Sequence, residues 1–313
     1  MVDAARKCGA DFIKFQCYVT DSFIAPGSPL LPIFKGAELS LADYRRISRK
    51  SQEAGITLIA TAIDLDGLAM IKSLDLPIVK IDSTNITNLC VLRAISETRK
   101  PVFLSTGASN LGEIERALMI LRQGTTDITL FHCTVQYPAD DDNLNLRALK
   151  TMAAAFPDAA IGYSDHSKGI VAAVAAVALG ARVLEKHFTL DNNMPGPDHQ
   201  FSSDPAAFAE YVTAIRRLEQ MLGDGRKAPV PVEELPRRRG RRYVTAMQDL
   251  AEGDVLSARS IRSRRVNPQL VDPIDSLSAE FEEMLPGWRV KKAMAAGTPL
   301  RWSNLISPDK GGS

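Results

Sequence analysis

Short apolar runs typical of β-strands alternate with helical segments along the first two thirds of the chain. Seven such runs can be recognised, and they begin at Phe12, Thr57, Ile78, Val102, Ile128, Ala160 and Val183. The segments between them are amphipathic, and two of them, LADYRRISRKSQEAG and LGEIERALMILRQG, end at a Gly, as many helices do. Strands that alternate with helices indicate βαβ units and a parallel sheet. The chain is therefore predicted to be an α/β protein.

The number of strands bears on the type of sheet. A (β/α)8 TIM-type barrel needs eight strands, but the chain opens on a helical segment, MVDAARKCGA, with no strand-like run before it. We expect a TIM-type barrel that lacks its first strand, which would lie upstream of this start; an open sheet is the alternative. Many runs end in polar residues, as in KFQ, KIDS, LSTG, HCT, YSDH and EKH. Because the carboxyl ends of barrel strands meet at one face, we predict a site there.

The character of the chain changes after residue 222, where the predicted barrel (1–222) ends. Residues 223–242, GDGRKAPVPVEELPRRRGRR, are rich in Pro, Gly and charge and show no apolar period, so we predict a linker. Residues 243–307 are predicted to form a small β-rich domain with an internal echo, since LAEGDVLSARSI is matched by MAAGTPLRWSNLI. The echo indicates a pseudo-symmetric fold. Residues 308–313 are predicted to be a tail.

Charge and cysteine content limit the classes of function. The formal net charge is +1 and 45% of the residues are hydrophobic, so nothing at the level of the whole chain favours a nucleic-acid or membrane partner. The arginines between Arg237 and Arg242 lack interleaved aromatics, which favours a solvated linker or an anion-facing arm over nucleic-acid binding. The first residues show no signal-peptide pattern, and the cysteine spacings match no metal or redox motif. These features predict a cytoplasmic protein.

Two of the four histidines follow strand-like runs. His166 lies in GYSDHSKG and His187 in VLEKHFTL, and each has an acidic residue nearby, Asp165 or Glu185. Neutral imidazole at the end of a rigid strand is a good ligand for a divalent transition metal, and the two carboxylates could orient the rings. Two histidine ligands would make an open site, suited to a metal that activates a substrate oxygen. The alternative is a pair of structural histidines, which spacing alone does not exclude.

Lysines, hydroxyl residues and an amide end several other strand-like runs. They are Lys14, Gln16, Thr61, Lys80, Ser83, Ser105, Thr106 and Ser164. At one face of a barrel they would form a cationic, hydroxyl-rich cup, which suits a phosphate or a phosphorylated carboxylate; solvated surface residues are the alternative. The sequence shows no Walker lysine loop, no dinucleotide-binding glycine pattern and no nucleophilic serine elbow.

A loop rich in Pro and Gly, NNMPGPDHQFSSDP, follows the last strand-like run and carries Asp198 and His199. One interpretation is a plain connection into the helix DPAAFAEYVTAIRRLEQML, capped by Asp204 or a neighbouring Ser. The other is a lid over the catalytic face, because a carboxylate there can accept hydrogen bonds from sugar hydroxyls. The residues alone leave both interpretations open.

The motifs KFQ, KIDS, LSTG, HCTVQYP, IGYSDHSKG, ALGARVLEKHFTL and GPDH occur in this order, and together they resemble the sialic acid synthase family. That family includes N-acetylneuraminate synthase and its pseudaminic acid, legionaminic acid and spore-coat polysaccharide relatives. The C-terminal part of the chain resembles the antifreeze-like (SAF) domain of the same family. The resemblance covers essentially the whole chain, and the run from SDH through EKHFT to GPDH is specific.

The resemblance implies a metal-dependent transferase that condenses phosphoenolpyruvate with an N-acylated mannosamine-type sugar and releases phosphate, for surface polysaccharide biosynthesis. His166 and His187 would hold the metal, usually Mn²⁺ with Mg²⁺ or Co²⁺ as alternatives, which would polarise the sugar aldehyde. Phosphoenolpyruvate would contact Lys14, Thr61, Lys80, Ser83, Ser105 and Ser164. The sugar would contact Gln16, Tyr137 and Asp198, and Lys80 and Asp198 would also be catalytic. Arg265 from the SAF domain of the other subunit would reach the site, which implies a domain-swapped homodimer.

Three features differ from the family pattern. The family's opening strand, with its Glu-Ile-Gly and Asn-His-x-Gly motifs, is missing, so a non-catalytic sugar- or phosphate-binding barrel is an alternative. Asn85, an expected sugar contact, stands where sialic acid synthases usually have an acidic residue, and Val135 stands where a small polar residue is common. These two changes favour a relative of spore-coat or surface-polysaccharide type. A Schiff-base aldolase, with Lys80 or Lys186 as the nucleophile, is a further alternative.

Overall fold

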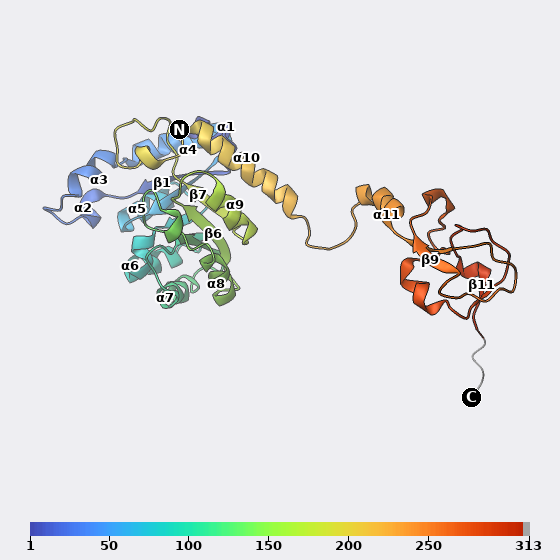
Figure 1. Cartoon of the computed structure of the whole chain (residues 1–313). Coiled ribbons are helices and arrows are strands. Elements are labelled where there is room, and N and C mark those ends of the chain that lie inside the picture. The colour runs from blue at the N-terminus through green and yellow to red at the C-terminus, as the bar shows by residue number, and fades with distance from the viewer. Residues whose placement is uncertain (309–313) are drawn as a thin grey trace. The chain divides into compact units, whose positions relative to one another are not determined.

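The computed structural model describes residues 1–308 and divides the chain into two compact units (Figure 1). The first unit is Met1–Asp224 and the second begins at Gly225. Each unit buries its own cluster of apolar side chains. Of the predicted tail (308–313), only Pro308 is described, and the rest of that prediction lies outside the described residues.

The first unit is built on one sheet of seven parallel strands, which follow one another in chain order. The strands are β1 (Phe12–Cys17), β2 (Thr57–Ala62), β3 (Val79–Ile81), β4 (Val102–Ser105), β5 (Ile128–Cys133), β6 (Ala160–Asp165) and β7 (Val183–Lys186). All seven predicted strands and the α/β class are therefore confirmed. The sheet curls so that its edge strands β1 and β7 approach each other through Lys14 and Glu185. Within residues 1–308, no strand pairs with the outer edge of either strand, so the barrel is not closed by strand pairing.

Helices connect the strands, and their ends follow from local sequence. They are α1 (Val2–Lys7), α2 (Thr20–Phe23), α3 (Leu31–Ala37), α4 (Leu41–Ala54), α5 (Leu65–Ser73), η1 (Ser83–Thr87), α6 (Leu89–Ser96), α7 (Leu111–Leu121), η2 (Asp141–Asn143), α8 (Ala148–Ala155), α9 (Val171–Ala178), η3 (His199–Phe201) and α10 (Pro205–Leu222). Helix α4 begins with a capping box of Ser40 and Asp43 and ends at Gly55, whose φ of 68° is left-handed. Helix α10 is capped by Asp204, as one interpretation of the preceding loop predicts. No helix in this part of the chain has the length and apolarity to cross a membrane.

The two faces of the sheet bury clusters of very different size. The outer face and its helices share the large apolar core of the first unit. The inner face carries a small cluster of Ile59, Phe103 and Phe131, against which Ile78 and Val183 pack. Side chains on one face of a strand recur every second residue. Two positions further along these five strands come the polar residues Thr61, Lys80, Ser105, Cys133 and Glu185. The small cluster is therefore the apolar floor of a polar site.

The second unit begins with the segment predicted as a linker, which contains η4 (Pro231–Glu233) and the exposed helix α11 (Glu234–Gly240). Two short antiparallel ladders follow, β8 (Tyr243–Ala246) with β9 (Ile261–Arg264) and β10 (Arg289–Val290) with β11 (Leu305–Ile306). The 3-10 turns η5 (Pro268–Leu270), η6 (Ala279–Met284) and η7 (Trp302–Asn304) connect them.

The two matching sequence segments of the second unit also have matching backbone structures. Leu250 and Met294, which begin the two matching segments, exchange backbone hydrogen bonds of 2.9 Å in both directions. Gly253 and Gly297 have φ values of 87° and 80°, and each donates its backbone N–H to a carbonyl 2.8 Å away in the other half. The positive φ at both turns explains why Gly recurs at the same place in the two segments.

Candidate active site

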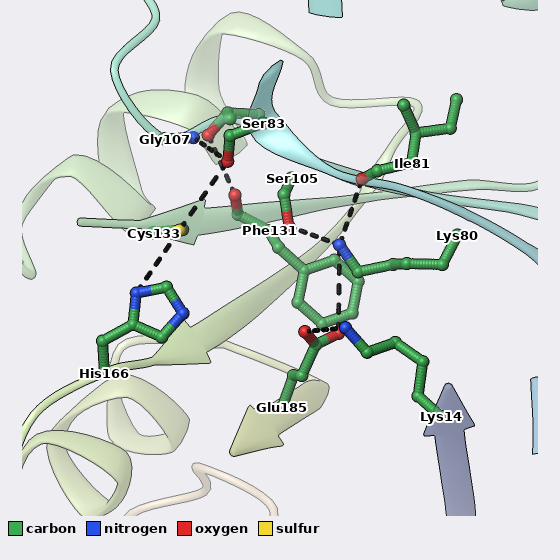
Figure 2. A network of polar contacts seen from close by, with 11 residues as sticks. Lys14, Lys80, Ile81, Ser83, Ser105, Gly107, Phe131, Cys133, His166 and Glu185 are labelled. Carbon is green, nitrogen blue, oxygen red and sulfur yellow. Dashed lines mark hydrogen bonds and ion pairs between the residues drawn. The ribbon is translucent and has the colours of Figure 1, made fainter. Parts of the chain in front are cut away.

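Three charged side chains from strands that are not neighbours in the sheet converge at one point (Figure 2). Nζ of Lys14 on β1 lies 2.8 Å from Oε1 of Glu185 on β7, and Nζ of Lys80 on β3 lies 3.8 Å from Oε2 of the same carboxylate. Strands β1 and β7 are the two edges of the sheet. Within the described residues, the Lys14–Glu185 ion pair therefore connects two edges of the sheet that are not paired with each other.

Lys80 is almost fully buried, with 1% of its surface exposed, and several contacts hold its ammonium in place. Its ammonium donates to the carbonyl oxygen of Ile81 at 3.1 Å and to Oγ of Ser105, and it lies 5.0 Å from the centre of the Phe131 ring. Burial lowers the pKa of Lys80, and the Glu185 carboxylate opposes this shift. A preorganised ammonium of this kind is suited to bind an anionic ligand.

Glu185 keeps its negative charge inside the site. Burial acts to raise its pKa, but the ammonium groups of Lys14 and Lys80 outweigh burial and hold the pKa at about 2. The carboxylate is thus ionised at neutral pH and faces two cationic side chains. One negative charge opposite two positive ones leaves the cluster able to take up further negative charge from a ligand.

Hydroxyl groups and a glycine complete this side of the site. Oγ of Ser83 accepts a hydrogen bond of 2.9 Å from the backbone N–H of Gly107. A Cβ atom at Gly107 would lie 2.8 Å from that oxygen and 2.5 Å from Cγ2 of Val135, so a larger residue would require one of these side chains to move. Oγ1 of Thr61 is buried without a hydrogen-bond partner in the described residues. A buried hydroxyl left unpaired costs free energy, which a ligand atom would relieve.

His166 and His187 lie side by side, with ring centroids 5.4 Å apart. The Tyr137 ring packs against both, at centroid distances of 4.2 Å and 5.6 Å, and Phe201 lies 5.1 Å from His187. Burial lowers the pKa of both imidazoles, and for His187 burial and then the Lys14 ammonium bring the pKa to about 4. Both rings are therefore neutral at pH 7, which is the form that binds metals.

A backbone carbonyl, and not a carboxylate, orients the first imidazole. Nδ1 of His166 lies 2.7 Å from the carbonyl oxygen of Thr134. Because a carbonyl only accepts, Nδ1 carries the proton and Nε2 keeps its lone pair for a ligand. The prediction that Asp165 and Glu185 orient the rings is wrong: Asp165 bonds to Ser167 and Lys186, and Glu185 bonds to the lysines of the site. Strand alternation places Asp165 on the opposite face of β6 from His166.

Comparison with known proteins places this geometry in a family. Residues 1–227 match the NeuB family and residues 241–306 match the SAF domain. The chain belongs to the NeuB family. It is 36% identical to the N,N'-diacetyllegionaminic acid synthase of Campylobacter jejuni, over 91% of this chain and 88% of that protein. The resemblance drawn from the sequence motifs is confirmed.

Solved structures of similar proteins agree with this assignment. A crystal structure of an N-acetylneuraminic acid synthetase from Leptospira borgpetersenii in complex with citrate has a TM-score of 0.72 and 34% identity, covering 75% of this chain and 82% of that one. The spore coat polysaccharide biosynthesis protein of Bacillus subtilis has a TM-score of 0.66 and 29% identity, covering 98% and 90% of the two chains. Both resemble this NeuB-family chain in fold and sequence.

The predicted sugar contacts of the NeuB-family chain lie in different environments. Asp198 is close to the imidazoles, with Oδ2 at 3.6 Å from Nδ1 of His187, and burial raises its pKa. Gln16 is exposed at the end of β1. Asn85 is 5% exposed, and its amide nitrogen donates to Oδ1 of Asp82 at 2.6 Å and to a backbone carbonyl at 3.0 Å. Asn85 thus supports the loop after β3, and its contact with a sugar stays a prediction.

Other predicted residues divide between the two units. Ser164 is buried near the end of β6 and is the register partner of Glu185 on β7. Arg265 follows β9 in the second unit and is exposed, so its approach to the site stays a prediction. The loop that carries Asp198 is fixed by its own contacts, because Thr189 Oγ1 lies 2.7 Å from Nδ1 of His199.

Sequence reasoning missed two members of the site. Glu185 was expected to orient a histidine, but it is the counter-ion of Lys14 and Lys80. Its place two residues before His187, on the same strand face, was a signal that it enters the site. The thiol of Cys133 lies 3.8 Å from Ser83 Oγ and 3.9 Å from Nδ1 of His166 (Figure 2), and burial raises its pKa, which keeps it protonated.

Two imidazoles form the donor set that the chain offers to a metal. Among the described residues, no group of three or more His, Cys, Asp or Glu side chains is arranged to hold a metal ion. His166 and His187 are both neutral, and Nε2 of His166 is free of the hydrogen bond that occupies Nδ1. This donor set fits an open site, in which substrate and water oxygens would complete the coordination.

Proposed function

We propose that this NeuB-family protein condenses phosphoenolpyruvate with the open-chain aldehyde of an N-acylated mannosamine-type sugar, releasing phosphate and forming a nonulosonic acid. One observation carries the proposal: a cationic, hydroxyl-lined cup around Lys14 and Lys80 lies beside a pair of neutral imidazoles, His166 and His187. The names of the relatives, a legionaminic acid synthase and an N-acetylneuraminic acid synthetase, support a sialic-type product. Such a product would serve surface polysaccharide biosynthesis.

The proposed reaction makes one carbon–carbon bond and breaks one carbon–oxygen bond. C3 of phosphoenolpyruvate attacks the aldehyde carbon of the sugar, and the aldehyde oxygen takes up a proton to become a hydroxyl. Water adds at C2, the bond between C2 and the phosphate oxygen breaks, and phosphate leaves with that oxygen. C2 is then the keto carbon of the product. The protein must therefore hold an anion, activate a carbonyl and move protons.

The anion-binding side of the site would hold phosphoenolpyruvate. In the proposal, the ammonium groups of Lys14 and Lys80 bind its phosphate and carboxylate by charge-assisted hydrogen bonds. Hydroxyl groups around them would donate further hydrogen bonds, and these belong to Thr61, Ser83, Ser105 and Ser164. Lys80 is already fixed by Ile81 and Ser105, so little side-chain entropy is lost when the anion binds.

The imidazole side would hold a divalent metal through His166 and His187. Mn²⁺ is our first choice and Mg²⁺ and Co²⁺ are the alternatives; when bound, the metal supplies Lewis-acid activation of the sugar aldehyde. Asp198, close to His187, would accept hydrogen bonds from sugar hydroxyls or hold a proton. The Tyr137 and Phe201 rings pack against the imidazoles and would limit the access of bulk water.

The quaternary structure and location are also part of the proposal. We expect a cytoplasmic homodimer in which Arg265 of one copy reaches the site of the other, and the exposure of Arg265 after β9 supports this. A Schiff-base mechanism through Lys186 is disfavoured, because its ammonium is buried 2.9 Å from Asp165 on the outer face of the sheet. Borohydride in the presence of a carbonyl substrate should therefore trap no adduct at Lys186.

The test is phosphate release from phosphoenolpyruvate in the presence of Mn²⁺ and a panel of sugars. The panel contains N-acetylmannosamine, its 6-phosphate and diacetamido hexoses, which separates the sugar classes named by the relatives. Release that requires both the sugar and Mn²⁺ would support the proposal and identify the substrate class. Binding of phosphoenolpyruvate without release for any sugar would instead favour a non-catalytic sugar- or phosphate-binding barrel.

A further inference from the structure

A buried ion pair lies on the outer face of the sheet, directly behind the two histidines. Nζ of Lys186 lies 2.9 Å from Oδ2 of Asp165, and their side chains are 5% and 0% exposed. These residues immediately precede His187 and His166, and neighbouring side chains of a strand point to opposite faces. The Lys186 ammonium accordingly lies 5.4 Å from the centre of the Tyr211 ring of α10, away from the imidazoles.

A second set of contacts joins the ion pair to the residue after His166. Oδ1 of Asp165 accepts hydrogen bonds from the backbone N–H and the hydroxyl of Ser167, at 2.9 Å and 2.6 Å. The ammonium of Lys186 also donates to the carbonyl oxygen of Ser167. The residues on both sides of His166 are therefore bonded to one lysine of the neighbouring strand, and that lysine precedes His187.

The Asp165–Lys186 ion pair lies where it can control the spacing of the two imidazoles. Asp165 and Lys186 are the last registered partners of β6 and β7, and both strands end at these residues. In the described part of the chain, the β6–β7 ladder does not extend to the histidines themselves. The ion pair thus joins the two strands at their last registered position, immediately before the rings, whose centroids lie 5.4 Å apart.

Stability alone is a weak reason for such a pair. Taking a carboxylate and an ammonium out of water costs free energy that their attraction only roughly offsets, so apolar replacements are often as stable. What the pair adds is a directional link of fixed length between two strands. We propose that Asp165 and Lys186 are positioning residues that set the spacing of His166 and His187 for a divalent metal. This inference rests on the proposed metal site.

The test measures Mn²⁺ binding to the full chain without substrate, by electron paramagnetic resonance of free Mn²⁺. Lys186→Met keeps the length of the side chain but removes its charge and its hydrogen bonds to Asp165 and Ser167. It should weaken Mn²⁺ binding by roughly tenfold to a hundredfold, as is typical when a group that orients metal ligands is lost. Wild-type affinity in this variant would overturn the inference.

A double variant separates positioning from the cost of an unpaired buried charge. Asp165→Asn combined with Lys186→Met leaves no charge unpaired, so its melting temperature should lie above that of Lys186→Met alone. Its Mn²⁺ affinity should nevertheless stay about tenfold or more below that of the wild type, because the directional link is still missing. Affinity that recovers together with stability would show that the pair does not position the imidazoles.

A control variant addresses general loss of stability. Ile71→Ala removes a fully buried side chain of the large apolar core and should lower the melting temperature while leaving the Mn²⁺ affinity unchanged. If Lys186→Met does not fold, the double variant decides between the outcomes. Wild-type protein that binds no Mn²⁺ would refute the proposed metal site itself, a result distinct from any difference between variants.

Discussion

The two sides of the site treat ionisable groups in opposite ways. On one side, Lys14 and Lys80 surround the ionised carboxylate of Glu185, with nitrogen–oxygen distances of 2.8 Å and 3.8 Å. On the other side, His166 and His187 are held neutral by burial. All five side chains lie on, or directly after, strands of one parallel sheet. The scaffold is therefore common to the two sides, and the difference arises from what surrounds each group.

The residues that surround each ionisable group explain how one scaffold produces two kinds of binding surface. Glu185 is partly buried beside opposite charges, which outweigh its desolvation and keep it ionised. His166 is buried beside a backbone carbonyl and the Tyr137 ring, and His187 is partly buried beside the Tyr137 and Phe201 rings, so desolvation is the largest influence on both pKa values. Fixed positive charge suits an anionic substrate, whereas neutral lone pairs suit a metal cation. Variants that act on one side alone test this division.

The largest effect is expected from the imidazole side. His187→Ala removes one of the two donors, so metal-dependent phosphate release should fall by roughly a thousandfold or more. The affinity for phosphoenolpyruvate should stay close to that of the wild type if the two sides are independent. Phosphate release and equilibrium binding of phosphoenolpyruvate would be measured on the same preparation.

Circular dichroism and thermal melting serve as the control for this variant, and both should resemble the wild type. Because the side chain of His187 is one quarter exposed, at 25%, its loss should leave the core intact. An Ala variant with full activity would rule out the metal assignment.

A smaller but still large effect is expected from the anion side. Lys80→Met removes a buried ammonium that donates to Ser105 and faces Glu185. The KM for phosphoenolpyruvate should rise by about a hundredfold, the equivalent of one strong charge-assisted hydrogen bond, while Mn²⁺ affinity should change little. Lys100→Met is the matched control, since Lys100 pairs with the exposed Asp75 at 2.7 Å. Equal KM values in the two variants would mean that Lys80 does not bind the substrate.

Removal of the shared counter-ion should affect stability more than chemistry. Glu185→Gln leaves the ammonium groups of Lys14 and Lys80 without a negative partner, so unfolding free energy at pH 7 should fall by about 2 kcal/mol. The pKa of Glu185 is lowered from 4.5 to about 2, so its stabilising effect is present above pH 4.5 and is lost as the pH falls towards 2. Urea unfolding across this pH range should show the difference between wild type and variant shrinking.

An exposed ion pair provides the comparison for that series. Glu219 pairs with Arg216 at 3.2 Å on the surface of α10, so Glu219→Gln should cost less than about 1 kcal/mol. A loss of stability in Glu185→Gln that is equal at all pH values would show that charge is not the cause.

The sequence was sufficient to predict the scaffold of this site. Seven strands were placed correctly, since each is a short apolar run bounded by helical segments, as in VFLST and ITLFHC. The convergence of Lys14 and Lys80 followed from the rule that parallel strands end at one face. Such inferences need only local patterns and the geometry shared by all sheets of this class.

The partners of individual side chains required the structure. Glu185 lies 171 positions from Lys14 in sequence, and the two meet because the curled sheet brings β7 towards β1. The sequence does not predict that the backbone carbonyl of Thr134 orients His166, because every residue carries a carbonyl. Asn85 matched a position expected to contact the sugar, yet its amide nitrogen donates to Asp82 of its own loop and to the carbonyl oxygen of Ile63 after β2. Curvature and backbone direction decide these contacts, and residue types alone do not specify them.

The smallest effect is expected from the residue that the second unit would contribute. Arg265→Ala should raise the KM for the sugar by about tenfold, as for one hydrogen bond to a charged group at an exposed position, and should leave the KM for phosphoenolpyruvate unchanged. Arg259→Ala, an exposed arginine of the same unit, is the control. An unchanged sugar KM in Arg265→Ala would refute its place in the site.

Mixed dimers show which copy supplies the arginine. When Arg265→Ala chains are mixed with His187→Ala chains, a site that takes its arginine from the other copy will in some dimers be fully wild type. About a quarter of all sites should then regain activity at low sugar concentration, because half of randomly formed dimers are mixed and each contains one intact site. If the arginine came from the same chain, every site in a mixed dimer would carry one defect, and mixing would restore nothing. The outcome therefore separates a site completed by a second copy from one that each chain builds alone.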